Sequence, residues 1–319
     1  MEYIKFCVTI TYAELLTQTE QISDQYDQLN QLKFVSDGTM THSIEGVSDG
    51  RMVAPNTLCF IEKAPTDAQT IARLQQAIVI TRPDVASQLY GCIGIVVDDP
   101  RSLYIDLLNK FSLVPGFSSF SSHIDKNPGI HPSAQIDQNA VIEDGVYIGA
   151  NTVISAGCVI KQGTCIGDDV TIRENTVIGC DGIALHKADD GRVLRFPHLA
   201  GVIIEDRVEL GASCVIPRGV LTSSKIGSDT VIGNLSNLGH AVKVGKRVWM
   251  SVGCLIGGNT LIADDCTLGL GVSVRDNLNI GKNCSLGMGS VVVKDLENNS
   301  SVFGNPARKV PNVKSGPAR

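Results

Sequence analysis

Aliphatic residues recur at every sixth position over most of the chain after residue 129. A period of six fits neither a helix of 3.6 residues per turn nor a strand with simple alternation. It is typical of a hexapeptide β-helix, in which each repeat is one short strand and one corner. The aliphatic positions form three runs: Ile130, Ile136, Ile142, Ile148, Ile154, Ile160, Ile166, Ile172 and Ile178; Ile204, Leu210 and Ile216; and Ile226, Ile232, Leu238, Val244, Met250, Ile256, Ile262, Leu268, Val274, Ile280, Leu286 and Val292.

Each repeat is expected to turn its aliphatic residue into the interior, where it stacks on its equivalent in the next coil. The fifth position of the repeat is usually small, as in Ile148–Val153 and Ile280–Ser285, because it also points inward near a corner. Three consecutive hexapeptides make one triangular coil. A coil cannot bury its apolar face alone, so the core forms only when coils stack. The three runs predict 24 repeats, or eight coils.

Two stretches interrupt the period. Residues 179–202 are too long for one repeat and contain Ala188-Asp-Asp-Gly191, a plausible hairpin turn. Residues 217–225 contain a slip of four residues, since Ile216 and Ile226 are ten apart. Insertions in solenoids often project from one face and line a binding site, so both are expected to leave the β-helix at a corner.

Residues 1–112 lack the hexapeptide pattern and predict a small α/β domain. Short β-type runs occupy 58–61, 77–80 and 93–97, and helices are expected over 67–76 and 101–111. The second helix is the better marked, with Asp99 as its N-cap and Pro100 in its first turn. A linker is expected over 113–128, the β-helix over 129–297, and a C-terminal cap and tail over 298–319.

Composition narrows the class of protein. The chain has 319 residues, 43% hydrophobic residues and a formal net charge of −6, with no basic block of the kind that binds nucleic acid. We expect no membrane span, because no apolar run reaches the length that a spanning helix needs, and no signal peptide at the start. A cytoplasmic protein with reduced thiols is therefore expected. Without a CxxC pair no metal is expected.

Five cysteines occupy the small fifth position and are expected to pack in the core: Cys158, Cys214, Cys254, Cys266 and Cys284.

His240 is the first candidate for chemistry. It stands at the third position of its repeat, which points out of the β-helix. Gly258 follows three repeats later, one full coil away at the equivalent position. A base beside a backbone N–H that can hold an oxyanion is the minimum set of groups for acyl transfer. On spacing alone, an ordinary surface histidine is favoured over a catalytic base, and a plain corner glycine is the alternative for Gly258. Asn234 and Asn237 are polar neighbours that can contact a substrate.

Several segments together resemble the UDP-3-O-acylglucosamine N-acyltransferases of lipid A synthesis. They are Gly201–Ala212, Arg218-Gly219, Ile232–Gly245, Asn56–Ile61 and Val96–Pro100, the last followed by a helix. The resemblance covers most of the chain, and the segment around His240 is the most specific. It implies a left-handed β-helix, a homotrimer with ligand sites between subunits, and a nucleotide-binding first domain.

Residue roles follow from the same resemblance. His240 matches the catalytic base, Gly258 the glycine of the oxyanion hole, and Phe60 an aromatic residue that stacks on the uracil. The chain departs from the family pattern at three places. Gly233 replaces an aspartate that orients the base, Asn277 replaces a second histidine, and Thr66 replaces a tyrosine. Asn277, and His198 within the long insertion, are further candidates for substrate contact.

The end of the chain resembles a different group of enzymes. The family's C-terminal helices are not found, and Val302–Val310 is similar to the closing segment of acetyl-CoA-dependent sugar acetyltransferases. That segment lies beside the coenzyme, so Asn305, Arg308 and Lys309 are expected to contact acyl-CoA. A cap that closes the last coil is the alternative interpretation of the segment, and both can hold together.

The sequence therefore predicts a bacterial N-acyltransferase that moves an acyl group from acyl-CoA to the amine of a nucleotide-linked amino sugar. Cell-surface polysaccharide synthesis is the expected setting. The alternatives are the lipid A enzyme with acyl carrier protein as donor, a sugar O-acyltransferase, and a scaffold without activity.

Overall fold

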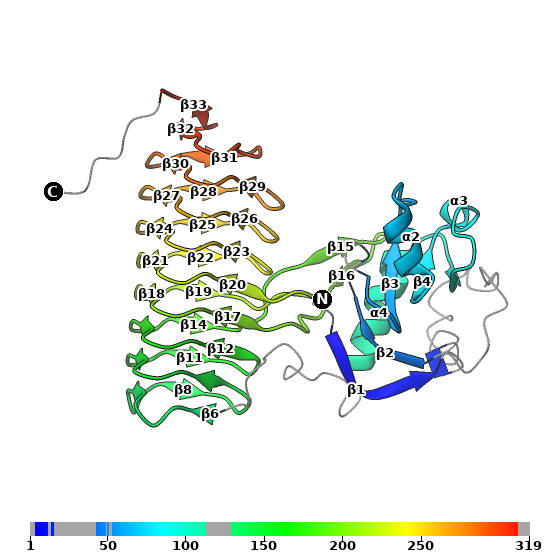
Figure 1. Ribbon diagram of the computed structural model, residues 1–319, viewed down its shortest axis with the longest axis horizontal. Helices are drawn as coiled ribbons and strands as arrows, with labels where there is room; N and C mark the ends of the chain where they lie inside the picture. Colours follow the sequence, from blue (N-terminus) through cyan, green and yellow to red (C-terminus); the bar gives the residue numbers. More distant parts are fainter. Residues whose placement is uncertain are drawn as a thin grey trace. The chain divides into compact units, whose positions relative to one another are not determined.

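The computed structural model describes residues 4–11, 14–15, 43–48, 50, 53–112 and 129–311 (Figure 1). The chain divides into two compact units. One comprises residues 1–122 together with the inserted segment 184–199, and the other comprises residues 123–183 and 200–319. The expected linker over 113–128 and the tail beyond residue 311 lie outside the described residues.

The second unit is a parallel β-helix with three faces (Figure 1). The first face holds β7 (Gln135–Ile136), β10 (Val153–Ile154), β13 (Thr171–Ile172), β18 (Glu209–Leu210), β21 (Val231–Ile232), β24 (Trp249–Met250), β27 (Thr267–Leu268), β30 (Ser285–Leu286), β32 (Ser301–Phe303) and β33 (Arg308–Lys309). The second holds β8 (Val141–Ile142), β11 (Val159–Ile160), β14 (Val177–Ile178), β19 (Val215–Ile216), β22 (Asn237–Leu238), β25 (Leu255–Ile256), β28 (Ser273–Val274) and β31 (Val291–Val292). The third holds β6 (Gly129–Ile130), β9 (Tyr147–Ile148), β12 (Thr164–Ile166), β17 (Val202–Ile204), β20 (Ser224–Ile226), β23 (Lys243–Val244), β26 (Leu261–Ile262) and β29 (Asn279–Ile280).

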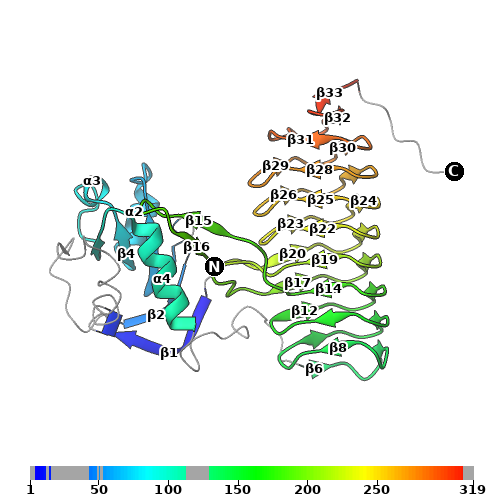
Figure 2. The ribbon, with the colours of Figure 1, turned by 180° about the vertical axis from the view of Figure 1, so that it is seen from behind.

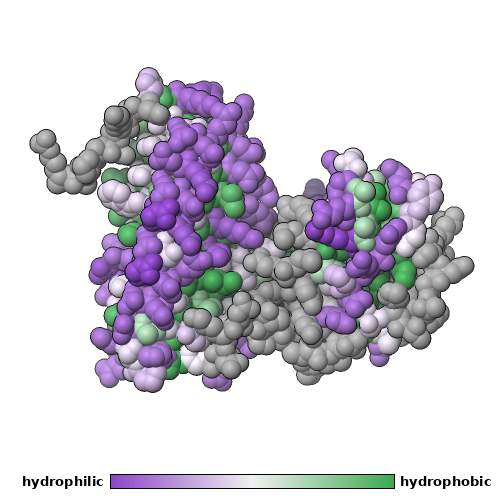
Figure 3. Space-filling model, viewed as in Figure 1, coloured by the Kyte–Doolittle hydropathy of each residue, from purple (hydrophilic) through white to green (hydrophobic). Residues whose placement is uncertain are grey.

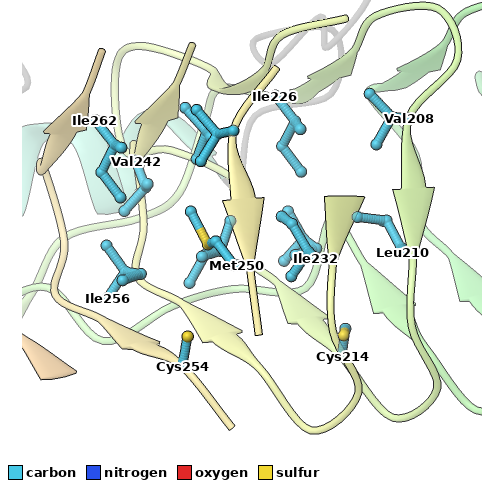
Figure 4. Close-up of a cluster of buried hydrophobic side chains, with 14 of the residues drawn as sticks. Val208, Leu210, Cys214, Ile226, Ile232, Val242, Met250, Cys254, Ile256 and Ile262 are labelled. Atoms are coloured by element: carbon cyan, nitrogen blue, oxygen red, sulfur yellow. The ribbon is translucent and has the colours of Figure 1, made fainter. Parts of the chain in front are cut away.

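The register of these strands confirms the predicted repeat. Strands pair in parallel with their equivalents one coil away, so that Ile154 lies against Ile172 and Ile232 against Met250. The aliphatic residues face the interior, and from Ile148 to Val292 the side chains at these positions are at most 4% exposed. Figure 4 shows this core, with residues of successive coils stacked between the faces. The eight strands of the second and third faces correspond to the predicted eight coils, and the predicted mainly β architecture is confirmed.

The corners give each coil its shape. Four residues separate two consecutive strands, and the third of them adopts a left-handed backbone conformation in most coils, as at Asn151, Asp169 and Arg247. The side chains at these positions form ladders on the outside, where Asn151 donates to Asp169 and Arg247 pairs with Asp265 at 2.7 Å. The face seen in Figure 3 is accordingly mostly hydrophilic over the β-helix, with scattered hydrophobic patches.

The five cysteines at the fifth position are buried, each at most 1% exposed, as the spacing predicts. Burial raises the pKa of their thiols, that of Cys254 to about 11 and that of Cys266 to about 12. A thiol with such a pKa is neutral at physiological pH and is a poor nucleophile. These residues therefore act as small apolar groups of the core.

The predicted insertion forms a hairpin. β15 (Leu185–Lys187) pairs antiparallel with β16 (Val193–Arg195), and Gly191 supplies the positive φ in the turn. The hairpin groups with the first unit, where Nδ2 of Asn109 donates to the carbonyl of Arg195 at 3.1 Å.

Polar contacts hold the hairpin in the same unit. Arg192 forms an ion pair with Asp106 at 3.5 Å, and Nε2 of His186 lies 3.5 Å from Asp99. The insertion thus carries the chain from the β-helix into the other unit and back.

Residues 217–225, where the repeat is interrupted, form a loop that is held by the buried side chain of Arg218. Arg218 is 5% exposed, and its guanidinium donates to the carbonyls of Gly179 at 2.6 Å and Gln162 at 3.0 Å. These bonds satisfy backbone acceptors where the hexapeptide ladder is interrupted.

The first unit contains a five-stranded sheet in the order β1 (Ile4–Thr11), β2 (Ser43–Val47), β3 (Thr57–Ile61), β4 (Ile78–Thr81) and β5 (Ile93–Val96). Strands β2 to β5 are parallel, and β1 is antiparallel to β2. The helices are α2 (Ala68–Leu74), α3 (Pro83–Ala86) and α4 (Pro100–Ser112). Figure 2 shows α4 along the sheet, where it contacts β3 and β4. The predicted α/β character is confirmed, and Asp99 accepts from the N–H of Ser102 as expected of an N-cap.

We predict that the inward and outward residues of one strand differ sharply in their effect on stability. Ile232→Ala is expected to lower the free energy of unfolding by about 2–5 kcal/mol, because it leaves a cavity at a fully buried position. Val231→Ala, at a side chain that is 39% exposed, is expected to change it by less than about 0.5 kcal/mol. Urea denaturation followed by circular dichroism measures both. Equal losses would contradict the assigned orientation of the strand.

Candidate functional site

The corner between β22 and β23 presents His240 on the outside of the β-helix. Leu238, the last residue of β22, is buried, as is Val242, the fourth corner residue. Between them Ala241 takes the left-handed conformation, with φ +55°. This alternation turns the side chain of His240, the second corner residue, away from the core, and it is half-buried.

Gly258 lies directly against the His240 ring. Leu238 pairs with Ile256, and the N–H of Asn259 donates to the carbonyl of His240 at 2.8 Å, which fixes the two corners in register. A Cβ atom built on Gly258 would lie 2.7 Å from Nε2 and 2.9 Å from Cδ2 of His240. The imidazole therefore occupies the space that any side chain at position 258 would need. The spacing of three repeats correctly predicts that the two residues are neighbours.

The backbone N–H of Gly258 is available as a donor. Across the described part of the chain, no backbone or side-chain atom accepts a hydrogen bond from it. An N–H beside an imidazole can bind an oxyanion that forms next to the base. The structure thus places the two predicted catalytic groups together, and their roles stay predictions.

Burial controls the charge of His240. Desolvation lowers the pKa of the imidazole below its ordinary value, and the negative charge of Asp276 opposes this shift. A lowered pKa keeps the ring neutral at physiological pH, as a general base requires. Asp276 stands at the second position of its corner, two coils from His240 and one coil from Gly258. The sequence analysis missed it, although a count of two full coils from His240 reaches it.

Gly233 packs against the backbone of the next coil. A Cβ atom there would lie 2.8 Å from the carbonyl carbon of Ser251 and 2.8 Å from the nitrogen of Val252. An aspartate at this position requires the coil to shift. The chain therefore lacks both the aspartate that orients the base in the resembled family and the space for such a side chain at position 233.

The asparagines that were predicted to bind substrate lie in different places. Asn234 belongs to the corner between β21 and β22, and its Oδ1 accepts from the N–H of Ala212 at 2.8 Å. Asn237 is exposed on β22, three residues before His240. Asn277 follows Asp276, to which its Nδ2 donates at 2.5 Å. Only Asn237 and Asn277 thus share the surroundings of His240.

The two remaining substrate candidates lie in the first unit. Phe60 is half-buried on β3, with the ring of Tyr104 at 5.0 Å between centroids and the guanidinium of Arg101 5.5 Å from its centroid. Arg101 also pairs with Glu62. His198 is 4% exposed in the same unit.

The residues predicted to contact CoA lie in the C-terminal cap. β33, with Arg308 and Lys309, is antiparallel to β32. Both side chains are exposed, and Nζ of Lys309 lies 2.8 Å from Glu297. Asn305 lies in the turn between the two strands.

In the residues that the structure describes, no group of three or more histidine, cysteine, aspartate or glutamate side chains is arranged to hold a metal ion. Over the same ranges, no helix is long and apolar enough to cross a membrane.

Comparison with known proteins identifies the repeat. The model of the bacterial transferase hexapeptide (six repeats) matches residues 121–162. The UDP-3-O-acylglucosamine N-acyltransferase of Methylorubrum extorquens (strain PA1) is 31% identical over 130 residues, which cover 41% of this chain and 37% of that protein. UDP-3-O-acylglucosamine N-acyltransferase 1 of Legionella pneumophila (strain Paris) is 43% identical over 58 residues, which cover 18% of this chain and 16% of that protein.

The chain resembles the UDP-3-O-acylglucosamine N-acyltransferases. The predicted resemblance to this family is confirmed, but these matches cover 41% and 18% of the chain rather than most of it, and less than two fifths of the length of the two relatives. Among solved structures, the UDP-N-acetylglucosamine acyltransferase of Francisella novicida is 23% identical, with a TM-score of 0.46 over 58% of this chain and 70% of that one. At this level the likeness supports no statement about activity.

We predict that Gly258→Ala displaces the His240 ring while the fold survives. The added Cβ collides with the end of a flexible side chain, which can rotate away. The imidazole then becomes less buried, so its pKa rises toward the ordinary value. A 13C NMR titration of histidine-labelled protein measures this pKa. Gly129→Ala, where a Cβ meets nothing within 4 Å, is the control, and an unchanged His240 pKa in Gly258→Ala would contradict the contact.

Proposed function

We propose that this protein is an acyltransferase that acylates the amine of a UDP-linked glucosamine. The observation that carries the proposal is the contact between His240 and Gly258 on adjacent coils, with no acceptor for the Gly258 N–H among the described residues. The names of the relatives support UDP-3-O-acylglucosamine as the acceptor. They favour the lipid A enzyme, the alternative in the sequence analysis, over a broader class of nucleotide sugars.

The geometry suits attack of an amine on a thioester. The neutral amine attacks the thioester carbonyl while His240 takes the proton from its nitrogen. The negative charge that develops on the carbonyl oxygen is stabilised by the N–H of Gly258. The intermediate then collapses with cleavage of the C–S bond. The departing thiolate recovers the proton from the imidazolium, and the products are an amide and a free thiol.

The nucleotide is proposed to bind in the first unit at Phe60. This ring is only half-buried and lies near the guanidinium of Arg101, which can stack on a base or meet a phosphate. Thr66 replaces the second aromatic residue of the resembled pattern.

The acyl donor separates the two main hypotheses. Acyl-CoA was predicted from the C-terminal segment, where Arg308 and Lys309 would meet its phosphates. The ion pair of Lys309 with Glu297 gives that lysine a partner within the cap, so a phosphate would have to compete for it. The names of the relatives favour the lipid A enzyme, for which the sequence analysis gives acyl carrier protein as the donor, so that is the donor we propose.

We predict that His240→Ala lowers kcat by about 10²–10⁴ without changing the thermal stability of the protein. In the wild type, kcat is expected to fall as the pH drops below the pKa of His240. Because burial lowers this pKa, the fall occurs at a more acid pH than for an exposed histidine. The assay follows release of the thiol with UDP-3-O-acylglucosamine as acceptor. Near wild-type turnover in His240→Ala would refute the mechanism.

The same assay distinguishes the remaining hypotheses. Faster turnover with acyl carrier protein than with CoA, at equal acyl chain, supports the lipid A type of donor, and the reverse supports the CoA-dependent one. An acceptor whose amine is replaced by a hydroxyl identifies an O-acyltransferase if it reacts equally well. A scaffold would cleave no thioester with any acceptor.

We further propose that three chains associate, as the resemblance implies. In three successive coils, the corner between the first and second faces exposes one apolar side chain: Val252 at 40%, Leu270 at 50% and Met288 at 63%. These residues stand at equivalent positions of successive coils and form a ladder parallel to the axis of stacking. An exposed apolar ladder of this kind suits burial against a second copy of the chain.

We predict that Leu270→Glu shifts the trimer toward the monomer, because it places a charge in the buried interface. Light scattering coupled to size exclusion measures the mass. Leu261→Glu, a leucine 42% exposed on the third face, is the matched control and is expected to stay trimeric. If Leu261→Glu dissociates and Leu270→Glu stays trimeric, the interface lies on the third face instead.

A further inference from the structure

The corner of Asp276 departs from a rule that holds elsewhere in the β-helix. Where the second corner residue is aspartate or asparagine and the structure describes the coil before it, its Oδ1 accepts from the N–H of the equivalent residue one coil earlier. The pairs are Asp168 with Ala150, Asp206 with Asp168, Asn234 with Ala212, Asp264 with Lys246 and Asn298 with Lys282, at 2.8–3.0 Å. By this rule Asp276 should accept from the N–H of Gly258.

Asp276 does not make that bond. Its Oδ2 instead accepts from Nδ2 of Asn277 at 2.5 Å, and among the described residues the Gly258 N–H has no acceptor. Asn277 is itself held, because Nδ2 of Asn259 donates to its Oδ1 at 3.3 Å. The side chain of Asn277 thus draws the carboxylate away from the one corner N–H that the proposed reaction needs.

The same carboxylate lies on the side of Gly258 opposite to the coil of His240. Neighbouring strands are about 4.8 Å apart, so two coils separate the backbones of His240 and Asp276 by roughly 10 Å. Gly258, between them, has no side chain, and the imidazole extends across it. The charge of Asp276 acts on the His240 ring, where it raises the pKa of the imidazole against the effect of burial.

We propose that Asp276 is a positioning residue, supplying from two coils away the negative charge that the chain lacks at Gly233. We propose in addition that Asn277 keeps this carboxylate from capping the Gly258 N–H. The inference rests on the proposed function. As the amine loses its proton, the carboxylate stabilises the imidazolium. It must do so without occupying the oxyanion site, because a carboxylate there would repel the developing negative charge.

Two variants separate these roles. Asp276→Asn keeps the shape and removes the charge, so the pKa of His240 is expected to fall further and the acid limb of kcat to move to lower pH. Asn277→Gly removes the amide and suits the left-handed backbone at this position, with φ +57°. Asp276 is then free to cap Gly258 as its equivalents do, and kcat is expected to fall up to about 10²-fold with little change in KM.

The double variant Asp276→Ala/Asn277→Gly carries no carboxylate to block the site. Its kcat is expected to return to that of Asp276→Ala alone, which a purely structural role of Asn277 would not produce. Asp264→Asn is the matched control, because Asp264 holds the same corner position and caps Lys246 away from His240. It is expected to leave both the His240 pKa and kcat unchanged.

Two readouts do not depend on the substrate. A 13C NMR titration gives the His240 pKa in each variant, and a crystal structure of Asn277→Gly shows where the Asp276 carboxylate lies. An unchanged pKa in Asp276→Asn overturns the charge role. A Gly258 N–H that stays free in the Asn277→Gly structure overturns the proposal that Asn277 keeps the Asp276 carboxylate from capping it. If both readouts agree with the proposal and no acyl transfer is detected, the proposed function fails and the proposed geometry stands.

Discussion

The in-register stacking of coils, each made of three hexapeptides, is the constraint on which the rest of this structure depends. Each strand donates to the carbonyls of the next coil, so the coils cannot slide without breaking every backbone bond between them. Inside, the aliphatic residues of successive coils meet, and a change of register by one residue would turn them to solvent. Outside, equivalent corner residues stand above one another. The stacking of aliphatic residues in the core fixes the register of the coils, and this register determines which surface side chains lie next to one another.

This arrangement explains why the candidate site is built along the axis of stacking. His240, Gly258 and Asp276 come from three coils, and nothing in their local sequence brings them together. Their meeting follows from the strand pairs on either side, Leu238 with Ile256 and Lys243 with Leu261. Gly258 has a double role in such a ladder. Its missing side chain makes room for the imidazole, and its N–H lacks the cap that the corner normally provides.

The features that depend on the six-residue period can be predicted from the sequence. Those that depend on a side-chain rotamer or on a tertiary contact cannot. The eight coils, the buried cysteines and the contact of His240 with Gly258 all follow from counting residues. The grouping of the hairpin over 184–199 with the first unit rests on polar contacts such as His186 with Asp99, which leave no periodic signal. Asn234 looks equally suited to substrate and to capping, and only its bond to Ala212 distinguishes the two.

The environment of His240 shows how burial and charge act against each other in one corner. Desolvation favours the neutral imidazole, whereas Asp276 favours the charged form. A carboxylate near enough to act on this imidazole is also near enough to cap Gly258, because the coil spacing brings both within reach of one side chain. In the proposed site, an acid two coils from His240 and one coil from Gly258 therefore needs a third residue to hold it aside. Asn277, one residue after Asp276 and bonded to it, occupies the position from which this is possible.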